Sequence, residues 1–378
     1  MHLTSKTRPF MYGVAIDENH FIGRQKEQSR LAANMRAGIS TILIAPRRYG
    51  KTSLVNRVAN EVSTDELIVV KLDVFACRDE YEFYNMFAEA VLHQTSSKFE
   101  EWRENARSFM ERLMPKISFA TDALQEYSVS LGITPKTHKP EEILDLPQMI
   151  AEKKNCRIVV CIDEFQQIGE MPDSVNIQKR LRSVWQNQSL VSYCLYGSKK
   201  HLMTTLFQSR SHPFYKFGDT MYLDRIGEED WLPYLKSRYE ERGLQLPDDM
   251  AQIICQKVQL HPSYVQQLAW MTMLNTNDIV TMDTIGCALS DLLNDNDALY
   301  SQQTESLTKY QVNFLRALLA GVEGGYGTTK TRDEYDLGTA SNIARIKTAL
   351  TEKELIESDG KRCFIADPVL QLWLKKRL

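Results

Sequence analysis

Five short apolar runs, separated by longer segments of mixed polarity, occupy the first two thirds of the sequence and constrain its fold more than any other feature. Each run is continuous rather than alternating and is rich in Val, Ile or other apolar residues, which is typical of strands buried on both faces of a sheet. The intervening segments are long enough to form helices, so consecutive strands can be joined by crossover connections. We therefore predict an α/β domain, residues 1–226, with a parallel sheet and flanking helices. The runs are residues 40–45, 67–75, 157–163, 191–197 and 220–223.

The stretch between residues 102 and 147 is less regular than the rest of this domain. Residues 127–133 read Tyr-Ser-Val-Ser-Leu-Gly-Ile and fit an additional strand. The polar residues from Lys136 onward predict a loop that enters a helix at Pro140, because proline suits the first turn of a helix.

The segment from Gly227 onward shows apolar residues at helical spacing and no strand signal. We predict a small helical domain, residues 227–304, with helices over residues 231–239 and 248–258 and a third helix that begins at Pro262. A further helix is expected over residues 282–300. The polar stretch 301–304 then fits a domain boundary.

The last segment, residues 305–378, predicts a winged-helix domain. Helices are expected over residues 309–320, 330–335 and 340–351. They are followed by two short strands around Asp359-Gly360, a dipeptide that favours a hairpin turn. Three helices followed by a hairpin are the pattern of a winged helix.

Composition limits the class of protein. A length of 378 residues allows two or three domains, and a hydrophobic content of 43% argues against a largely disordered chain. No apolar run approaches the roughly 18–20 residues that span a bilayer, and the N-terminal residues lack the apolar core of a secretory signal. The seven cysteines are scattered and form no CxxC pair, which favours buried thiols in a reducing compartment. We expect a cytoplasmic protein with no membrane partner.

A phosphate-binding loop is the strongest chemical signal in the sequence. The first apolar run leads directly into this loop, and a helical run over residues 53–62 follows it. Gly50 allows the backbone N–H groups to approach a phosphate chain closely. Lys51 can reach the β- and γ-phosphates of a nucleotide, and the Thr52 hydroxyl can bind Mg²⁺. The predicted cofactor-binding residues of the loop are Ala45, Pro46, Arg47, Arg48, Tyr49, Gly50, Lys51, Thr52 and Ser53, with Ala45 at a position where Gly is usual.

An acidic pair, Asp163-Glu164, ends the third apolar run. Ligands of open α/β sheets bind beside the carboxyl ends of the strands, where these two carboxylates are expected. Asp163 is then placed to support Mg²⁺, and Glu164 can polarise an attacking water molecule.

With these motifs the sequence resembles the prokaryotic archaeal-type ATPases, a branch of the AAA+ and STAND P-loop NTPases. The resemblance covers most of the chain, and the predicted helical lid and winged helix follow in the order found in the family. It rests on Phe21-Ile22-Gly23-Arg24 with Glu27, on residues 45–54 and 159–166, on Leu181–Gln186, on Gly197-Ser198 and on Pro213-Phe214-Tyr215.

The resemblance implies roles that the residue pattern alone does not assign. Ser198 is implied as the polar sensor near the γ-phosphate, which makes Lys51, Glu164 and Ser198 the implied catalytic residues. Gly23 and Arg24 are implied to line the adenine side of the site, together with His261 and Pro262 from the lid. Leu260 stands where the family usually has Gly before this pair.

The resemblance leaves the arginine finger unassigned. Where the family often has Gly-Arg after the Pro-aromatic-Tyr segment, this chain has Lys216, which keeps the charge but not the bidentate geometry of Arg. The remaining candidates are Arg47, Arg48, Arg180, Arg182, Arg210 and Arg225, so activation by a neighbouring subunit stays open.

The C-terminal residues 306–378 carry 12 Lys and Arg against nine Asp and Glu, which gives a local charge of +3 and leaves −6 for the remainder. Ile343, Ile346 and Leu350 form the expected buried face of the recognition helix. The candidate DNA contacts are Asn342, Arg345, Lys361 and Arg362. Docking of a protein partner is the alternative, because winged helices also serve as protein-docking or autoinhibitory modules.

Three functions remain open from the sequence. The leading hypothesis is an ATP-binding, Mg²⁺-dependent ATPase whose nucleotide state controls the winged helix. ATP rather than GTP is implied by the family resemblance. The alternatives are a nucleotide-gated DNA-binding regulator with slow or no hydrolysis, and a protein-interaction switch. A nucleotide-dependent homo-oligomer is compatible with each of the three.

Overall fold

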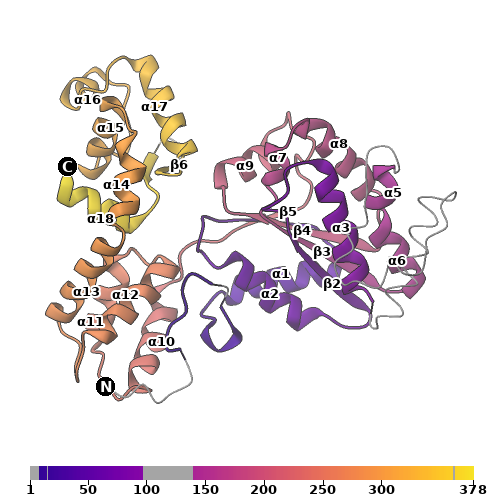
Figure 1. The fold of residues 1–378 in the computed structure, drawn as a ribbon, viewed down its shortest axis with the longest axis horizontal. Coiled ribbons are helices and arrows are strands. Elements are labelled where there is room, and N and C mark those ends of the chain that lie inside the picture. Colours follow the sequence, from indigo (N-terminus) through magenta and orange to yellow (C-terminus); the bar gives the residue numbers. More distant parts are fainter. Residues whose placement is uncertain (1–7, 15, 97–138, 361) are drawn as a thin grey trace. The chain divides into compact units, whose positions relative to one another are not determined.

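The structure is a computed structural model that describes residues 8–14, 16–96, 139–360 and 362–378. It divides into two compact units. Arg24–Asp224 form one unit, and the N-terminal residues up to Gly23 form the other together with Arg225–Leu378 (Figure 1). The strand predicted over residues 127–133 and the loop predicted at 136–138 lie outside the described residues.

The first unit contains a five-stranded sheet in the order β2-β3-β4-β1-β5, in which all pairs are parallel. The predicted α/β fold is therefore confirmed, and each strand lies within two residues of its predicted bounds. The register places Ile44 opposite Gly197 and Asp73 opposite Asp163, so the carboxyl ends of the central strands meet at one edge. The strands are β1 (Thr41–Ile44), β2 (Leu67–Asp73), β3 (Arg157–Asp163), β4 (Val191–Gly197) and β5 (Asp219–Tyr222).

Helices flank this sheet, as Figure 1 shows. One part of the core is aromatic: the Trp185 ring stacks on Tyr193 at a centroid distance of 4.0 Å, and Phe165 packs edge-on to Phe214 at 5.4 Å. This cluster fixes the chain just after β3, where the acidic pair lies. The described helices are α1 (Gln25–Ala37), α2 (Lys51–Val62), α3 (Glu80–Gln94), α5 (Pro140–Leu144), α6 (Leu146–Lys154), α7 (Gln167–Glu170), α8 (Ser174–Trp185) and α9 (Lys200–Gln208).

The second unit begins with the helices predicted for the lid. The single helix expected over residues 282–300 is wrong, because Asn296 separates two helices and its side-chain amide donates to the carbonyl of Leu292 at 2.8 Å. The polar stretch 301–304, at which a domain boundary is predicted, is helical. These residues continue a helix that is anchored by the buried Tyr300. The helices are α10 (Glu228–Glu240), α11 (Asp248–Lys257), α12 (Pro262–Leu274), α13 (Met282–Asp295) and α14 (Asp297–Glu305).

The winged helix is present as predicted, with one additional helix. α15 (Lys309–Leu319), α16 (Thr329–Glu334) and α17 (Ala340–Glu352) precede the antiparallel pair β6 (Ile356–Asp359) and β7 (Arg362–Ile365). The additional helix is α18 (Pro368–Arg377), which begins at a proline and is capped by Asp367. The sequence signal was available in Asp367-Pro368 and the apolar residues that follow.

The lid helices and the winged helix share one hydrophobic core. Asp367 links them through both carboxylate oxygens. Oδ1 accepts the backbone N–H groups of Val369 and Leu370, while Oδ2 accepts the hydroxyls of Tyr264 at 2.6 Å and Tyr300 at 3.1 Å. The side chain that starts the last helix is therefore also held by two lid tyrosines.

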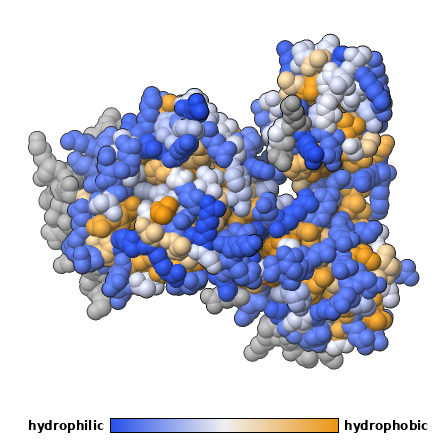
Figure 2. Space-filling model, turned by 180° about the vertical axis from the view of Figure 1, so that it is seen from behind, coloured by the Kyte–Doolittle hydropathy of each residue, from blue (hydrophilic) through white to orange (hydrophobic). Residues whose placement is uncertain are grey.

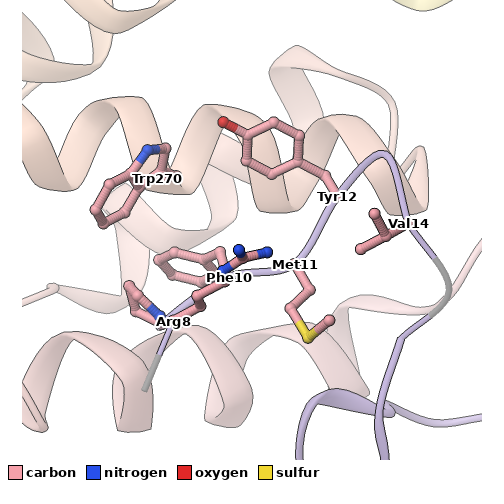
Figure 3. A pocket seen from close by; sticks show the side chains of 7 residues that line it. Arg8, Phe10, Met11, Tyr12, Val14 and Trp270 are labelled. Carbon is pink, nitrogen blue, oxygen red and sulfur yellow. The ribbon is translucent and has the colours of Figure 1, made fainter. Parts of the chain in front are cut away.

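The N-terminal segment belongs to this second unit although it begins the chain. The Phe10 ring lies edge-on to Tyr234 and Tyr239, each at 6.1 Å, and the Met11 N–H donates to Oε1 of Gln266 at 3.0 Å. A cavity of about 270 Å³ separates this segment from Trp270 on α12 (Figure 3). These contacts hold Phe10 and Met11 against the lid helices.

The described surface is largely polar. Figure 2 shows apolar residues in small groups among hydrophilic ones on the face drawn. Within the described ranges, no helix is both long and apolar enough to cross a membrane. Six of the seven cysteines are buried, as expected for structural thiols, whereas Cys287 is exposed.

Candidate nucleotide-binding site

The loop between β1 and α2 has the geometry of a phosphate cradle. Gly50 has a φ angle of 85°, a left-handed conformation that glycine adopts without strain, and α2 begins at the next residue. The N-terminus of α2 therefore directs its first N–H groups at the loop, where the helix dipole favours an anion. Lys51 is only 5% exposed, and its Nζ donates to the carbonyls of Ala45 at 3.0 Å and Pro46 at 2.9 Å.

The other loop residues divide into exposed and buried ones. Arg47 and Arg48 are exposed, and Arg48 has a left-handed backbone with φ of 64°. Tyr49 and Ser53 are buried. The two arginines are therefore the loop side chains that a ligand can reach from solvent.

Thr52 and Asp163 meet at the carboxyl edge of the sheet. The Thr52 hydroxyl donates to Oδ2 of Asp163 at 2.7 Å, and the Glu164 N–H donates to Oδ1 at 2.8 Å. Both predicted magnesium ligands are thus brought together, from the start of α2 and the end of β3. Their oxygens are hard donors of the kind that Mg²⁺ prefers.

Asp163 carries a buried carboxylate without a neutralising partner. It is 8% exposed, and none of the cationic side chains in the described ranges forms an ion pair with it. Burial raises the pKa of Asp163 to about 6, although the hydrogen bonds from Thr52 and from the backbone of Glu164 act in the opposite direction. A bound cation would offset this burial, so the residues fit a magnesium ion.

Glu164 is held by two side-chain donors. The Ser198 hydroxyl, 6% exposed, donates to Oε2 of Glu164 at 2.8 Å, and Nε2 of Gln166 donates to the same oxygen. Glu164 itself has a left-handed backbone with φ of 53°, which is uncommon for a residue with a side chain. The structure therefore brings Ser198 and Glu164 together. The contact with Gln166 was not predicted, because no sequence rule places a side chain three residues past a strand end.

Arg24 lies against the phosphate loop. It is 7% exposed, and its guanidinium donates to the carbonyl of Tyr49 at 3.1 Å and to Glu27 at 3.2 Å. Burial lowers the pKa of Arg24, while Glu27 favours the charged form. Arg24 thus contacts the backbone just before Gly50, a role beyond the adenine contact that the resemblance implies.

The other residues implied on the adenine side belong to the second unit. Gly23 precedes Arg24 at the boundary of the two units. His261 precedes α12, and its Nδ1 accepts the N–H of Tyr264 at 3.5 Å, while Pro262 opens the helix. Both His261 and Pro262 are buried, and a contact with nucleotide remains a prediction for these three residues.

Several arginines considered for the finger role are already engaged within their own unit. Arg180 bonds to Glu80 at 2.7 Å, and the Arg182 guanidinium lies 5.0 Å from the centroid of Phe217. Arg225 donates to Gln259 at 3.1 Å. Arg210 is exposed after α9 and makes no ion pair within the described ranges. The structure therefore leaves Arg210 and the loop arginines as the accessible candidates.

The predicted DNA contacts are not equivalent in the winged helix. Arg345 is exposed on α17, whereas Asn342 is half-buried and donates to the carbonyl of Leu337 at 3.4 Å. Arg362 is exposed and lies 3.5 Å from Glu323, and Lys361 lies outside the described residues. Ile343, Ile346 and Leu350 are buried as predicted.

Comparison with known proteins supports this architecture. Residues 298–376 match the family model of a probable winged helix domain. No curated protein sequence matches the chain. The Walker-type ATPase PABY2304 of Pyrococcus abyssi has a similar structure, with a TM-score of 0.70 and 18% identity over 97% of this chain and 100% of that chain. The ORC2 protein of Aeropyrum pernix in ADPNP–ADP complexes gives a TM-score of 0.59 and 14% identity over 97% and 99%, and its ADP form gives 0.57 and 14% over 96% and 97%.

The fold and the comparisons define a P-loop NTPase fold followed by a C-terminal winged helix. The structural neighbours include an archaeal Walker-type ATPase and an archaeal ORC protein. The resemblance to archaeal-type ATPases is therefore confirmed at the level of the fold.

Proposed function

We propose that this protein is a Mg²⁺-dependent ATPase whose nucleotide state controls its C-terminal winged helix. The observation that carries the proposal is the hydrogen bond between Thr52 and Asp163, which joins the phosphate loop to the acidic end of β3. A hydroxyl that follows a loop lysine and a buried carboxylate are the residues that hold Mg²⁺ in P-loop enzymes. The proximity of Thr52 and Asp163 supports a catalytically competent site rather than one that has lost its metal-binding residues.

The triphosphate would bind at the start of α2. The N–H groups after Gly50 supply hydrogen-bond donors, and Lys51 supplies a charge that is held by two carbonyls. Because these carbonyls are weaker acceptors than a phosphate oxygen, Lys51 can exchange them for the β- and γ-phosphates. The structural neighbour solved with ADPNP and ADP supports an adenine nucleotide as ligand.

Hydrolysis would use Glu164. Thr52 and Asp163 would hold Mg²⁺, whose charge would offset the negative charge that develops on the phosphate oxygens. Glu164 would accept a proton from the water that attacks the γ-phosphorus, and ADP would leave as the bond to its β-phosphate oxygen breaks. Ser198 donates to Glu164 at 2.8 Å, which supports its role as a polar sensor that reports on the γ-phosphate.

The nucleotide state would reach the winged helix through the lid. Asp367 of the winged helix accepts the hydroxyls of Tyr264 and Tyr300, so the two domains can move as one body. Of the predicted domain 1–226, we assign residues 24–226 to the ATPase domain, because the residues up to Gly23 belong to the unit of the lid and winged helix; we assign 227–304 to the lid and 305–378 to the winged helix. Nucleotide-dependent self-association would supply Arg210 to a neighbouring site.

DNA binding is the second candidate function, and the exposure of Arg345 on α17 favours it. This side chain lies on the helix that enters the major groove in winged-helix proteins, and none of the described residues forms an ion pair with it. Docking of a protein partner on the same face is the alternative.

The direct test is phosphate release by the purified full chain with ATP and Mg²⁺. Lys51→Ala should weaken ATP binding by about 100-fold or more, because the triphosphate loses its main charge partner. Lys179→Ala, which removes an exposed lysine from the same unit, should bind ATP normally. Undiminished ATP binding by Lys51→Ala would contradict the proposal.

A further inference from the structure

Gln166 is a buried side chain that points back toward the acidic pair. It is 1% exposed and lies in the turn between β3 and α7. The turn is fixed from two sides: the Phe165 N–H donates to the carbonyl of Tyr196 at 2.9 Å, and the Gln167 N–H donates to the carbonyl of Glu164 at 2.9 Å. These backbone hydrogen bonds hold the turn so that the side-chain amide of Gln166 donates to Oε2 of Glu164.

Gly197, the last residue of β4, makes room for this amide. A Cβ atom at position 197 would lie 1.9 Å from Oε1 of Gln166 and 3.0 Å from Sδ of Met203. A contact of 1.9 Å is far below any van der Waals distance, so a larger residue would displace the Gln166 side chain. Glycine at position 197 and glutamine at position 166 thus form a matched pair.

The buried position of the Gln166 amide is unfavourable for the free energy of folding. Its Oε1 is buried and has no hydrogen-bond partner among the described residues. An unsatisfied buried acceptor is unfavourable for folding, because it has lost its hydrogen bonds to water and gained none in return. Among the described residues, the hydrogen bond of the Gln166 side chain goes to Glu164, so the polar group of Gln166 serves that carboxylate.

We propose that Gln166 is a positioning residue for ATP hydrolysis, which holds the Glu164 carboxylate together with Ser198. Both donors converge on Oε2, and within the described part of the chain Oε1 of Glu164 accepts no hydrogen bond. One oxygen is therefore fixed while the other is left to accept the proton of a water molecule. The inference rests on the proposed ATPase function and concerns the rate of the chemical step, not the binding of nucleotide.

The test compares Gln166→Met with Gln167→Met in the full chain. Methionine keeps the length of the side chain and removes the N–H donor, and Gln167 is the half-buried neighbour whose side chain makes no hydrogen bond in the described ranges. Gln166→Met should lower kcat by about 10- to 100-fold, because a misplaced general base loses its alignment. The affinity for a fluorescent ATP analogue and the KM should change by less than about 3-fold, and Gln167→Met should behave as wild type.

A double-variant cycle separates positioning from a general structural effect. In a Glu164→Gln background, Gln166→Met should lower the residual turnover by less than about 2-fold, because there is no base left to position. A wild-type kcat in Gln166→Met would overturn the inference, and so would an equal loss in both backgrounds. If Glu164→Gln alone keeps wild-type turnover, the proposed function of Glu164 fails first.

Gly197→Ala keeps the inference testable if Gln166→Met does not fold. The added methyl group should displace the Gln166 amide and reproduce the loss of kcat with unchanged nucleotide affinity. A folded Gly197→Ala variant with wild-type kcat would also overturn the inference.

Discussion

The Thr52 hydroxyl lies 2.7 Å from Oδ2 of Asp163, although 111 residues separate the two in the chain. Strand order explains this proximity, because β1 and β3 each neighbour β4 and their carboxyl ends lie at one edge of the sheet. The phosphate loop after β1 and the acidic pair after β3 are therefore parts of one site.

Asp163→Asn should stabilise the nucleotide-free protein above pH 6 while it abolishes Mg²⁺-dependent nucleotide binding. The folded-state pKa of Asp163 is raised to about 6 from an ordinary value of 3.8. The folded state therefore binds the proton more tightly than the unfolded state, and this contribution to stability, present below pH 4, is lost as the pH rises through 6. The loss amounts to about 2–3 kcal/mol.

Urea denaturation of wild type and Asp163→Asn in EDTA, at pH 4.5 and 7.5, measures this effect. The neutral variant should lose less stability than wild type between the two pH values. Identical pH dependence in the two proteins would show that the carboxylate is not buried as described.

Arg24→Ala should weaken ATP binding by about 10-fold. The buried guanidinium donates to the carbonyl of Tyr49, so its loss leaves the loop before Gly50 less well organised for phosphate. Titration with a fluorescent nucleotide measures the change. Arg36→Ala is the matched control, since Arg36 is exposed at the end of the same helix and pairs with Glu61. Equal nucleotide affinities in Arg24→Ala and wild type would show that Arg24 does not organise the phosphate loop.

Asp367→Ala should lower the free energy of unfolding by about 2–4 kcal/mol. The change removes the cap of α18 and the acceptor shared by two tyrosine hydroxyls. Urea denaturation gives the energy, and amide hydrogen exchange over residues 368–377 should accelerate. Asp333→Ala, at an exposed position in α16, is the control. Unchanged exchange in α18 would mean that the lid tyrosines do not hold this helix.

If DNA is the ligand, Arg345→Ala should weaken DNA binding by about 5- to 10-fold. The slope of log affinity against log salt concentration should fall by about one, the value for one lost phosphate contact. Fluorescence anisotropy of labelled duplex DNA at several salt concentrations gives both quantities. Lys376→Ala removes an exposed charge from α18 and serves as the control. A wild-type salt slope in Arg345→Ala would favour a protein partner for this face.

The sheet could be predicted from the sequence because its strands are continuous apolar runs, and the loop because its residues are contiguous. Lys51 and Thr52 could be predicted as site residues from the sequence of the loop alone. α18 was not predicted, although Asp367-Pro368 precedes an apolar stretch. The break between helices at Asn296 involves a hydrogen bond from its side chain to the Leu292 carbonyl, which the spacing of apolar residues does not reveal.

The contacts that complete the site could not be predicted, because they depend on tertiary packing. Gln166 reaches Glu164 only because the turn after β3 is anchored by Tyr196. Arg24 reaches the Tyr49 carbonyl across 25 residues of chain. Neither contact follows from spacing, since the first depends on how β4 anchors the turn and the second on the fold bringing two segments together.

ATP turnover by Glu164→Gln, measured beside its ATP affinity, tests the central claim most directly. The variant should bind ATP with wild-type affinity and hydrolyse it about 100-fold more slowly or worse, because the amide cannot accept the proton of the attacking water. Wild-type turnover in Glu164→Gln would contradict the account.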